Sequence, residues 1–426
     1  MPKTPPTQDA ALLNRQALSA YNASDFEQAI EHSRAALVAL EGLDDPETQR
    51  LIDKAFERLA MTYQRIGDFA AAREVIDQWQ QRTNREEGYI QVLIQLSRVE
   101  SYTGNYEEAA RLAEEATERA DKHEYPWGIA MSRRVRADLM WKMGYVEQAL
   151  TFAQQALAIF EQVGDLEQQA ATHVAIAASH HFAGQFFKSI QHLQRALRIV
   201  EHLGRRFEMA IVYSNLGETY AELYAMDKAL DAHQKAVELV GFERAHPDLI
   251  RNLGVDLISV GRQDEGCKYL AMALERAQSI NDPDLVAQVL FSLAEVDLGN
   301  GDLIQAERHG QELQQIAIRL DSLRHRIRAL MILGEFARQQ GDHVTAQAHF
   351  NDSSMMVQRS ADRHSIWQTH AALHDLLRES MPQMADIHRR IAAEMMTHIL
   401  TGIDDDALRQ AFRRAEPVQS VLGPLT

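Results

Sequence analysis

The chain has 426 residues, of which 46% are hydrophobic and 7% aromatic, enough apolar material for an extended core. Its 44 basic and 61 acidic residues give a net charge of −17, which argues against nucleic acid or an anionic membrane as a direct partner, because phosphate groups require a basic surface. The one cysteine, Cys267, excludes an intramolecular disulfide, and no signal sequence or run of about 18 apolar residues is present. We therefore expect a cytoplasmic protein without a membrane span.

The first seven residues contain three prolines and no apolar periodicity, so we expect residues 1–7 to be disordered. No helix-turn-helix domain fits ahead of the first repeat, which again argues against direct binding to DNA. An array of helices is expected from residue 8 to residue 361.

A short phrase recurs through that array: a glycine, a polar residue, an aromatic or apolar residue and, three positions further on, an alanine. Examples are IGDFAAA from Ile66, TGNYEEA from Thr103 and NGDLIQA from Asn300. The turn position of each copy falls, in chain order, at Ser24, Gly67, Gly104, Gly144, Gly184, Tyr224, Gly261, Gly301 and Gly341. Successive turns lie 37–43 residues apart, and a regular period of this size indicates a solenoid.

Amphipathic segments with apolar residues at i, i+3, i+4 and i+7 flank each turn, which predicts two antiparallel helices per unit. A glycine at the turn allows a left-handed residue to end the first helix at low cost. Small residues stand seven positions before the turn, as at Gly217 and Gly334, and five positions after it, as at Ala229. We expect them to let the paired helices approach closely.

The pattern weakens after about residue 361. Residues 362–400 predict a degenerate terminal hairpin, with a break at Met381 and Pro382. Residues 401–426 predict one short helix and a tail that would cap the last apolar face, because the end of a solenoid needs covering. The expected fold is therefore all-α: a right-handed superhelical solenoid of about nine or ten antiparallel hairpins.

The segment NLGETYAELYAMDKALDAHQKAVEL from Asn215 carries the small and aromatic positions of the tetratricopeptide repeat, and the whole array resembles that family. Periods longer than the family's usual one are similar to the repeats of bacterial peptide-pheromone receptors of the Rap and NprR type, MalT-like activators and kinesin light chains. This resemblance implies a non-enzymatic scaffold that binds a peptide or protein segment, as in a bacterial signalling or regulatory receptor. A homodimer is compatible with it.

The resemblance also implies that the first helix of each unit lines a concave groove. The expected groove residues are Arg98, Tyr102, Arg134, Asp138, Trp141, His181, Asn215, Glu218, Arg251, Asn252, Phe291 and Glu295. An asparagine amide can both donate to and accept from a peptide backbone, and arginine can pair with a carboxylate through two hydrogen bonds. The alternative is structural: the asparagines bond neighbouring helices, and Arg134 and Asp138 form an ordinary i, i+4 pair.

Two other functions remain open. A co-chaperone or assembly factor would have a more apolar groove. A metal-dependent enzyme could use His370 and His374, which are spaced i, i+4 on a helix. No GxGxxG, HExxH, CxxC or GxSxG string occurs, so we expect no catalytic residues, no metal and no cofactor.

Overall fold

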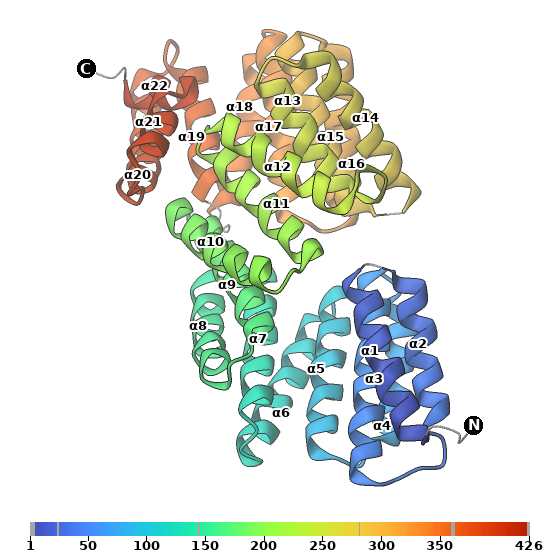
Figure 1. Cartoon of the computed structure of the whole chain (residues 1–426). Helices are drawn as coiled ribbons and strands as arrows, with labels where there is room; N and C mark the ends of the chain where they lie inside the picture. Colours follow the sequence, from blue (N-terminus) through green and yellow to red (C-terminus); the bar gives the residue numbers. More distant parts are fainter. Residues whose placement is uncertain (1–4, 24, 144, 281, 359–362, 424–426) are drawn as a thin grey trace. The chain divides into compact units, whose positions relative to one another are not determined.

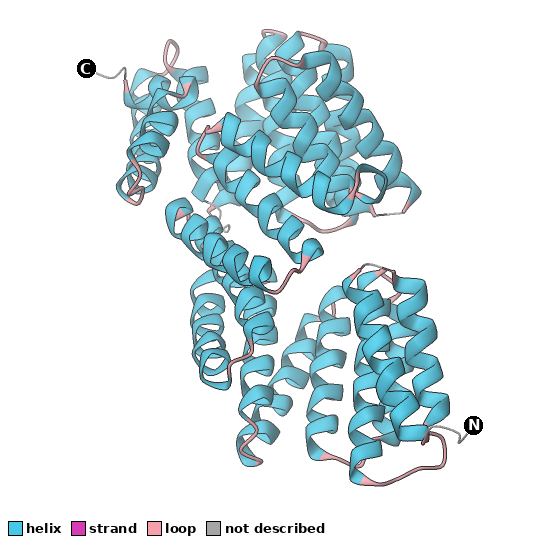
Figure 2. Cartoon of the chain, viewed as in Figure 1, coloured by secondary structure: helices cyan, strands magenta, loops and turns pink. Residues whose placement is uncertain are grey.

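The computed structural model describes residues 5–23, 25–143, 145–280, 282–358 and 363–423. These residues form helices joined by turns, with no strand among them (Figures 1 and 2). The chain divides into two compact units: unit 1 comprises residues 1–176 and 195–208, and unit 2 comprises residues 177–194 and 209–426. The all-α hairpin solenoid predicted from the sequence is confirmed.

The helices follow one another in ten hairpins within the described residues, and two short helices end the chain. The bounds are α1 Pro6–Asn22, α2 Phe26–Ala39, α3 Pro46–Arg65, α4 Phe69–Arg82, α5 Glu86–Tyr102, α6 Tyr106–Lys122, α7 Pro126–Lys142, α8 Val146–Val163, α9 Leu166–Phe182, α10 Phe186–His202 and α11 Arg206–Glu222. They continue with α12 Met226–Val240, the 3-10 turn η1 Phe242–Arg244, α13 Pro247–Ser259, α14 Gln263–Ser279, α15 Pro283–Asn300, α16 Leu303–Arg319, α17 Leu323–Gln339, α18 His343–Val357, α19 Arg363–Leu377, α20 Pro382–Thr401, α21 Asp406–Arg414 and α22 Glu416–Leu422.

The turn residues have the backbone conformation that their glycines suggest. The φ angle is positive at Gly67, Gly104, Gly184, Gly261, Gly301 and Gly341, between 70° and 86°. Tyr224 takes the same place in its hairpin with a φ of 55°, which is uncommon for a residue with a side chain. Ser24 and Gly144, the other two expected turn positions, lie outside the described residues.

The paired helices approach closely where the small residues lie. A Cβ added at Gly217 would stand 2.4 Å from Nε2 of His233 on the opposing helix. At Gly334 it would stand 2.5 Å from Cε1 of Phe350. Ala229 on α12 is fully buried. The small residues therefore make room for large side chains of the partner helix, which fill the space between ridges.

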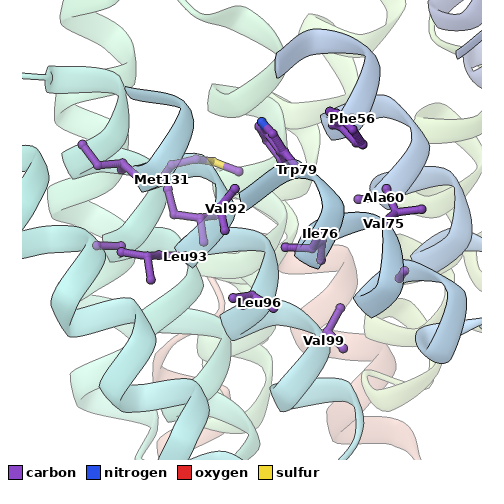
Figure 3. Packing of buried hydrophobic residues seen from close by; sticks show 14 of the residues in the cluster. Phe56, Ala60, Val75, Ile76, Trp79, Val92, Leu93, Leu96, Val99 and Met131 are labelled. Atoms are coloured by element: carbon purple, nitrogen blue, oxygen red, sulfur yellow. The ribbon is translucent and has the colours of Figure 1, made fainter. Parts of the chain in front are cut away.

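Unit 1 starts earlier than the sequence suggested. Helix α1 begins at Pro6, so the expected disorder is wrong for Pro6 and Thr7, and residues 1–4 lie outside the described residues. Proline is well suited to the first turn of a helix, because its fixed φ fits there and the missing N–H would have no partner. Behind α1, the core of unit 1 packs Phe56 of α3 against Trp79 of α4, with ring centroids 6.4 Å apart (Figure 3).

Contacts join the first helices of unit 2 to α19. A Cβ at Gly184, in the turn before α10, would lie 3.3 Å from the side chain of Arg363 on α19. His364 of α19 lies 2.6 Å from the carboxylate of Glu222 at the end of α11. The first helices from α11 to α19 thus complete a turn of the superhelix, because a small rotation per repeat accumulates along a solenoid.

The C-terminal segment differs from the single helix that the sequence predicted. It forms two short helices, α21 and α22, with an extended residue, Ala415, between them. Pro417 explains the break, since its ring would clash with the carbonyl four residues earlier in a continuous helix. Phe412 of α21 is fully buried, and its ring centroid lies 6.1 Å from that of Tyr224. The segment therefore packs against the α11–α12 turn as well as on α20.

Candidate functional site

The first helices of consecutive hairpins pack on one another. In unit 1, α3 contacts α1 and α5, and α5 contacts α7. In unit 2, α15 contacts α13 and α17, and α17 contacts α19. Helices that pack side by side along a curved stack lie on its inner side. The expected groove residues all belong to first helices of hairpins, namely α5, α7, α9, α11, α13 and α15, so the structure allows each one to be placed.

In unit 1, the expected residues form a small group around Arg134, which has one buried nitrogen without a hydrogen-bond partner in the described part of the chain. Arg134 on α7 lies 3.6 Å from Asp138, the ordinary i, i+4 pair that the alternative interpretation allowed. The Nε of Arg134 is nevertheless buried and has no hydrogen-bond partner among the described residues. Burial lowers the pKa of Arg134, and the neighbouring Arg98 lowers it further. Tyr102 is exposed and stacks on Phe69 with ring centroids 5.2 Å apart.

Trp141 also lies on the first helix α7 of unit 1 and is half-buried. It has contacts of its own within the protein. Its place on the inner side is therefore compatible with packing between helices as well as with contact to a ligand.

In unit 2, two of the expected ligand-binding residues are already engaged. Asn252 on α13 is only 5% exposed, and its Nδ2 donates to Oε1 of Glu218 on α11 over 3.1 Å. Arg251 donates through Nε and Nη2 to Oδ1 of Asp248 over 3.0 and 2.8 Å. Asn252 therefore bonds a neighbouring helix, as the structural alternative describes. Arg251 forms its hydrogen bonds with Asp248 of its own helix.

Two other residues of unit 2 have polar atoms left over. The side-chain amide of Asn215 on α11 is half-buried and makes no hydrogen bond within the described part of the chain. Glu295 on α15 is exposed, and its carboxylate has no ion pair within 4 Å among the described residues. Although the side chain reaches the surface, the protein packed around it reduces its hydration and raises the pKa of Glu295 to about 7, while Arg328 and Arg251 act in the opposite direction.

An aromatic and a basic side chain lie next to this carboxylate. The guanidinium of Arg328 on α17 stands over the ring of Phe291 on α15, 4.7 Å from its centroid. Phe291 is half-buried, so its ring packs against the guanidinium of Arg328 and still offers an apolar surface. We define the inner strip of unit 2 as Asn215, Glu218, Arg251, Asn252, Phe291, Glu295 and Arg328.

A second cluster closes one end of the strip. Burial alone would raise the pKa of Glu222, but His364, His181 and Arg328 together lower it to about 2. His181 on α9 also bonds Oγ1 of Thr219 through Nδ1 over 3.2 Å. The Glu222–His364 pair ties α11 to α19, and His181 therefore acts within the scaffold.

Sequence reasoning missed Arg328, Glu222 and His364. Arg328 stands thirteen residues before its turn at Gly341, a position that the helical register already makes inward-facing, but it was not among the residues selected. Asp248 occupies the same place in its own unit, so applying that register to every unit would have found both. His364 follows the last recognisable repeat, so alignment with other repeats could not predict which side of its helix faces inward.

The candidate metal ligands have other partners. Nδ1 of His370 lies 2.8 Å from Nδ1 of His388, and Nδ1 of His374 bonds the carbonyl oxygen of Ala385 over 3.1 Å. Among the described residues, no three His, Cys, Asp or Glu side chains are grouped as a metal site would require. Within the same residues, no helix is both long and apolar enough to cross a membrane.

Models of known protein families match parts of the repeat array. A tetratricopeptide repeat model matches residues 128–201 and 168–240, and a second such model matches residues 327–351. The matched residues are tetratricopeptide-like repeats. No curated protein matches the sequence.

Solved structures of tetratricopeptide-like repeat proteins share the fold at low identity. A Rap protein complexed with competence and sporulation factor superposes with a TM-score of 0.60 at 15% identity, over 83% of this chain and 98% of that one. The Rap conjugation gene regulator of plasmid pLS20, in complex with the Phr* peptide, gives 0.53 at 13% identity, over 84% and 98%. Aspartyl phosphate phosphatase F from Bacillus subtilis gives 0.53 at 12% identity, over 83% and 94%.

Proposed function

We propose that this repeat protein is a non-enzymatic receptor that binds an extended peptide or protein segment along the inner strip of unit 2. One observation carries the proposal: Asn215 and Glu295 keep unengaged polar atoms among neighbours that are already bonded. A hydrogen-bonding group without a partner is a natural contact for an incoming chain. Two of the structural relatives are named as complexes, one with competence and sporulation factor and one with the Phr* peptide, which supports the same role.

The chemistry of the strip suggests how a segment would lie. The Asn215 amide can bond a backbone N–H and a C=O at once, as a peptide requires. The Glu295 carboxylate suits an amino terminus or a basic side chain, and Phe291 offers an apolar surface beside it. Arg251 and Asn252, held by Asp248 and Glu218, give the strip a fixed shape, so little side-chain freedom is lost on binding.

The architecture supports a regulatory role. The array makes up most of the chain, and its closed turn in unit 2 depends on contacts between α11 and α19. A segment bound across these helices would stabilise the closed turn, because a ligand favours the conformation that it binds. We infer a signalling or regulatory receptor whose output is a change in the stability or curvature of unit 2.

The test is selection of peptides from a random phage-displayed library on the full-length protein, followed by titration of the selected peptides. N215A and E295Q should each weaken binding by about tenfold, the effect of losing one hydrogen bond to a charged or buried group. The control is E265Q, which removes a half-buried carboxylate of the second helix α14 that pairs with Arg262. Failure to select any peptide, or equal affinities for E295Q and the unsubstituted protein, would contradict the proposal.

A further inference from the structure

A basic pocket lies in unit 1, on residues that the inner strip does not include. It has a volume of about 400 Å³ and is lined by Leu166 and His173 of α9 and by Arg195, Arg198, Ile199 and His202 of α10. All six residues belong to unit 1. The four residues from α10 are spaced i, i+3, i+4 and i+7, so they share one face of the helix.

The two arginines of this pocket are uncompensated. Arg195 and Arg198 are exposed, and neither forms an ion pair within 4 Å or a hydrogen bond in the described part of the chain. Arg205, which follows α10, is by contrast paired with Glu167 over 2.8 Å. Like charges three residues apart on a helix repel each other, so the pair is destabilising without an anion. Two neighbouring arginines without a carboxylate partner are unexpected in a protein with a net charge of −17.

The repeats provide an internal comparison. Arg195 and Arg198 stand eleven and fourteen residues after the turn at Gly184. The corresponding residues are Gln155 and Ala158 in the preceding hairpin, and Lys235 and Glu238 in the following one. No other hairpin carries arginine at both places. The repeat fold therefore does not require these cations, and they are particular to the α9–α10 hairpin.

The floor of the pocket is suited to an anion that carries an organic group. His173 is only 6% exposed, and burial together with the two arginines lowers the pKa of His173 to about 4. Its imidazole is thus neutral at physiological pH, so the positive charge comes from the rim. Leu166 and Ile199 provide apolar walls beside the guanidinium groups.

We propose that this pocket binds an organic phosphate monoester. Two guanidinium groups can each give a pair of parallel hydrogen bonds to the oxygens of one dianion, which a carboxylate with two oxygens cannot satisfy as fully. The ester group lies against Leu166 and Ile199. The site shares no residue with the inner strip and does not depend on the function proposed for it.

The experiment is calorimetric titration of the full-length protein with phenyl phosphate, inorganic phosphate and benzoate. Phenyl phosphate should bind saturably and more tightly than either of the others, because only it offers both a dianion and an apolar group. Benzoate binding as tightly would overturn the phosphate assignment. Inorganic phosphate binding as tightly would overturn the ester assignment, and an absence of saturable binding in the millimolar range would overturn the site.

Variants locate the site. R195Q/R198Q should weaken phenyl phosphate binding by about tenfold or more, the effect of losing charge-assisted hydrogen bonds. The matched control, R111Q/R262Q, removes the same charge from two exposed arginines that pair with Glu108 and Glu265. It should bind like the unsubstituted protein, and an equal loss in both variants would show a general charge effect and overturn the assignment.

A second readout does not depend on any substitution. In protein labelled at histidine, the ring signals of His173 should shift as phenyl phosphate is added, with the same dissociation constant as the calorimetry. Unmoved His173 signals at saturating phenyl phosphate would place the ligand elsewhere and overturn the assignment.

Discussion

Gly217 is where a single methyl group should do most damage to the hairpin array. An added Cβ would meet three ring atoms of His233, at 2.4, 2.5 and 2.6 Å. That ring is 1% exposed, and it bonds Oδ2 of Asp256 over 2.5 Å and the carbonyl oxygen of Ser214 over 3.1 Å. The imidazole cannot move away without leaving the buried Asp256 unpaired.

The expected cost of G217A follows from three effects. Overpacking a core costs about 1–3 kcal/mol. A buried polar group left without its partner costs about 1–3 kcal/mol more. The better helix propensity of alanine offsets about 1 kcal/mol. We expect a net destabilisation of about 3 kcal/mol, equivalent to a roughly hundredfold change in an equilibrium constant.

Native-state hydrogen exchange of α11 and α12 is the appropriate assay, because each repeat contacts only its neighbours and can open locally. Exchange in these helices should accelerate about a hundredfold, in line with the estimated destabilisation. The control is G299A in α15, where nothing lies within 4 Å of the added Cβ. That variant should exchange at an unchanged or slightly lower rate, because only the helix propensity changes.

A double-mutant cycle tests the cause. In an H233A background the ring is absent, so G217A should cost little or become favourable. If G217A accelerates exchange equally with and without the His233 ring, the close approach of α11 and α12 is not the reason, and this account of the small residues is wrong.

Three further predictions follow from other parts of the structure. D53A should destabilise unit 1 by about 3 kcal/mol in urea denaturation, because the buried Asp53 carboxylate accepts hydrogen bonds from Trp79 and Arg85 over 2.8 and 3.0 Å; an unchanged midpoint would argue against that network. The pKa of Glu295 is raised to about 7, so folding stability should fall as pH rises from the ordinary glutamate value toward 7 and level off above it, and E295Q should abolish that fall; a rise over the same window would reverse the sign of the argument. F412A should cost about 3–5 kcal/mol and expose the α11–α12 turn to hydrogen exchange, because Phe412 is fully buried beside Tyr224; protection of that turn at the unsubstituted level would exclude such a role for α21.

The sequence predicted the repeating parts of this fold well, because each repeat needs the same turn residue and the same small residues where its two helices meet. Tyr224 lacks the conformational freedom of glycine, yet alignment with the neighbouring repeats predicted it at the turn, where its φ is positive. Features that depend on the sum of many repeats were not predictable. The return of α19 to α11 arises from small rotations that no single repeat encodes, so the pairing of His364 with Glu222 could not be foreseen.

The candidate site was predictable by element and less so by atom. The positions before each turn located Asn215, Arg251, Asn252 and Glu295 on first helices, as helical periodicity requires. Which of them is free depends on neighbouring side chains from other repeats: Asn252 is engaged by Glu218, and Arg251 by Asp248 of its own helix. Such rotamer choices are set by packing and charge in three dimensions.

Photo-cross-linking of a selected peptide tests the central claim most directly. The peptide carries one photoreactive residue, is irradiated with the full-length protein, and the attachment points are mapped by mass spectrometry. We predict attachment to the first helices of unit 2, around Asn215 on α11 and around Phe291 and Glu295 on α15. Attachment confined to the second helices α12, α14 and α16 would contradict the assignment of the inner strip as the binding surface.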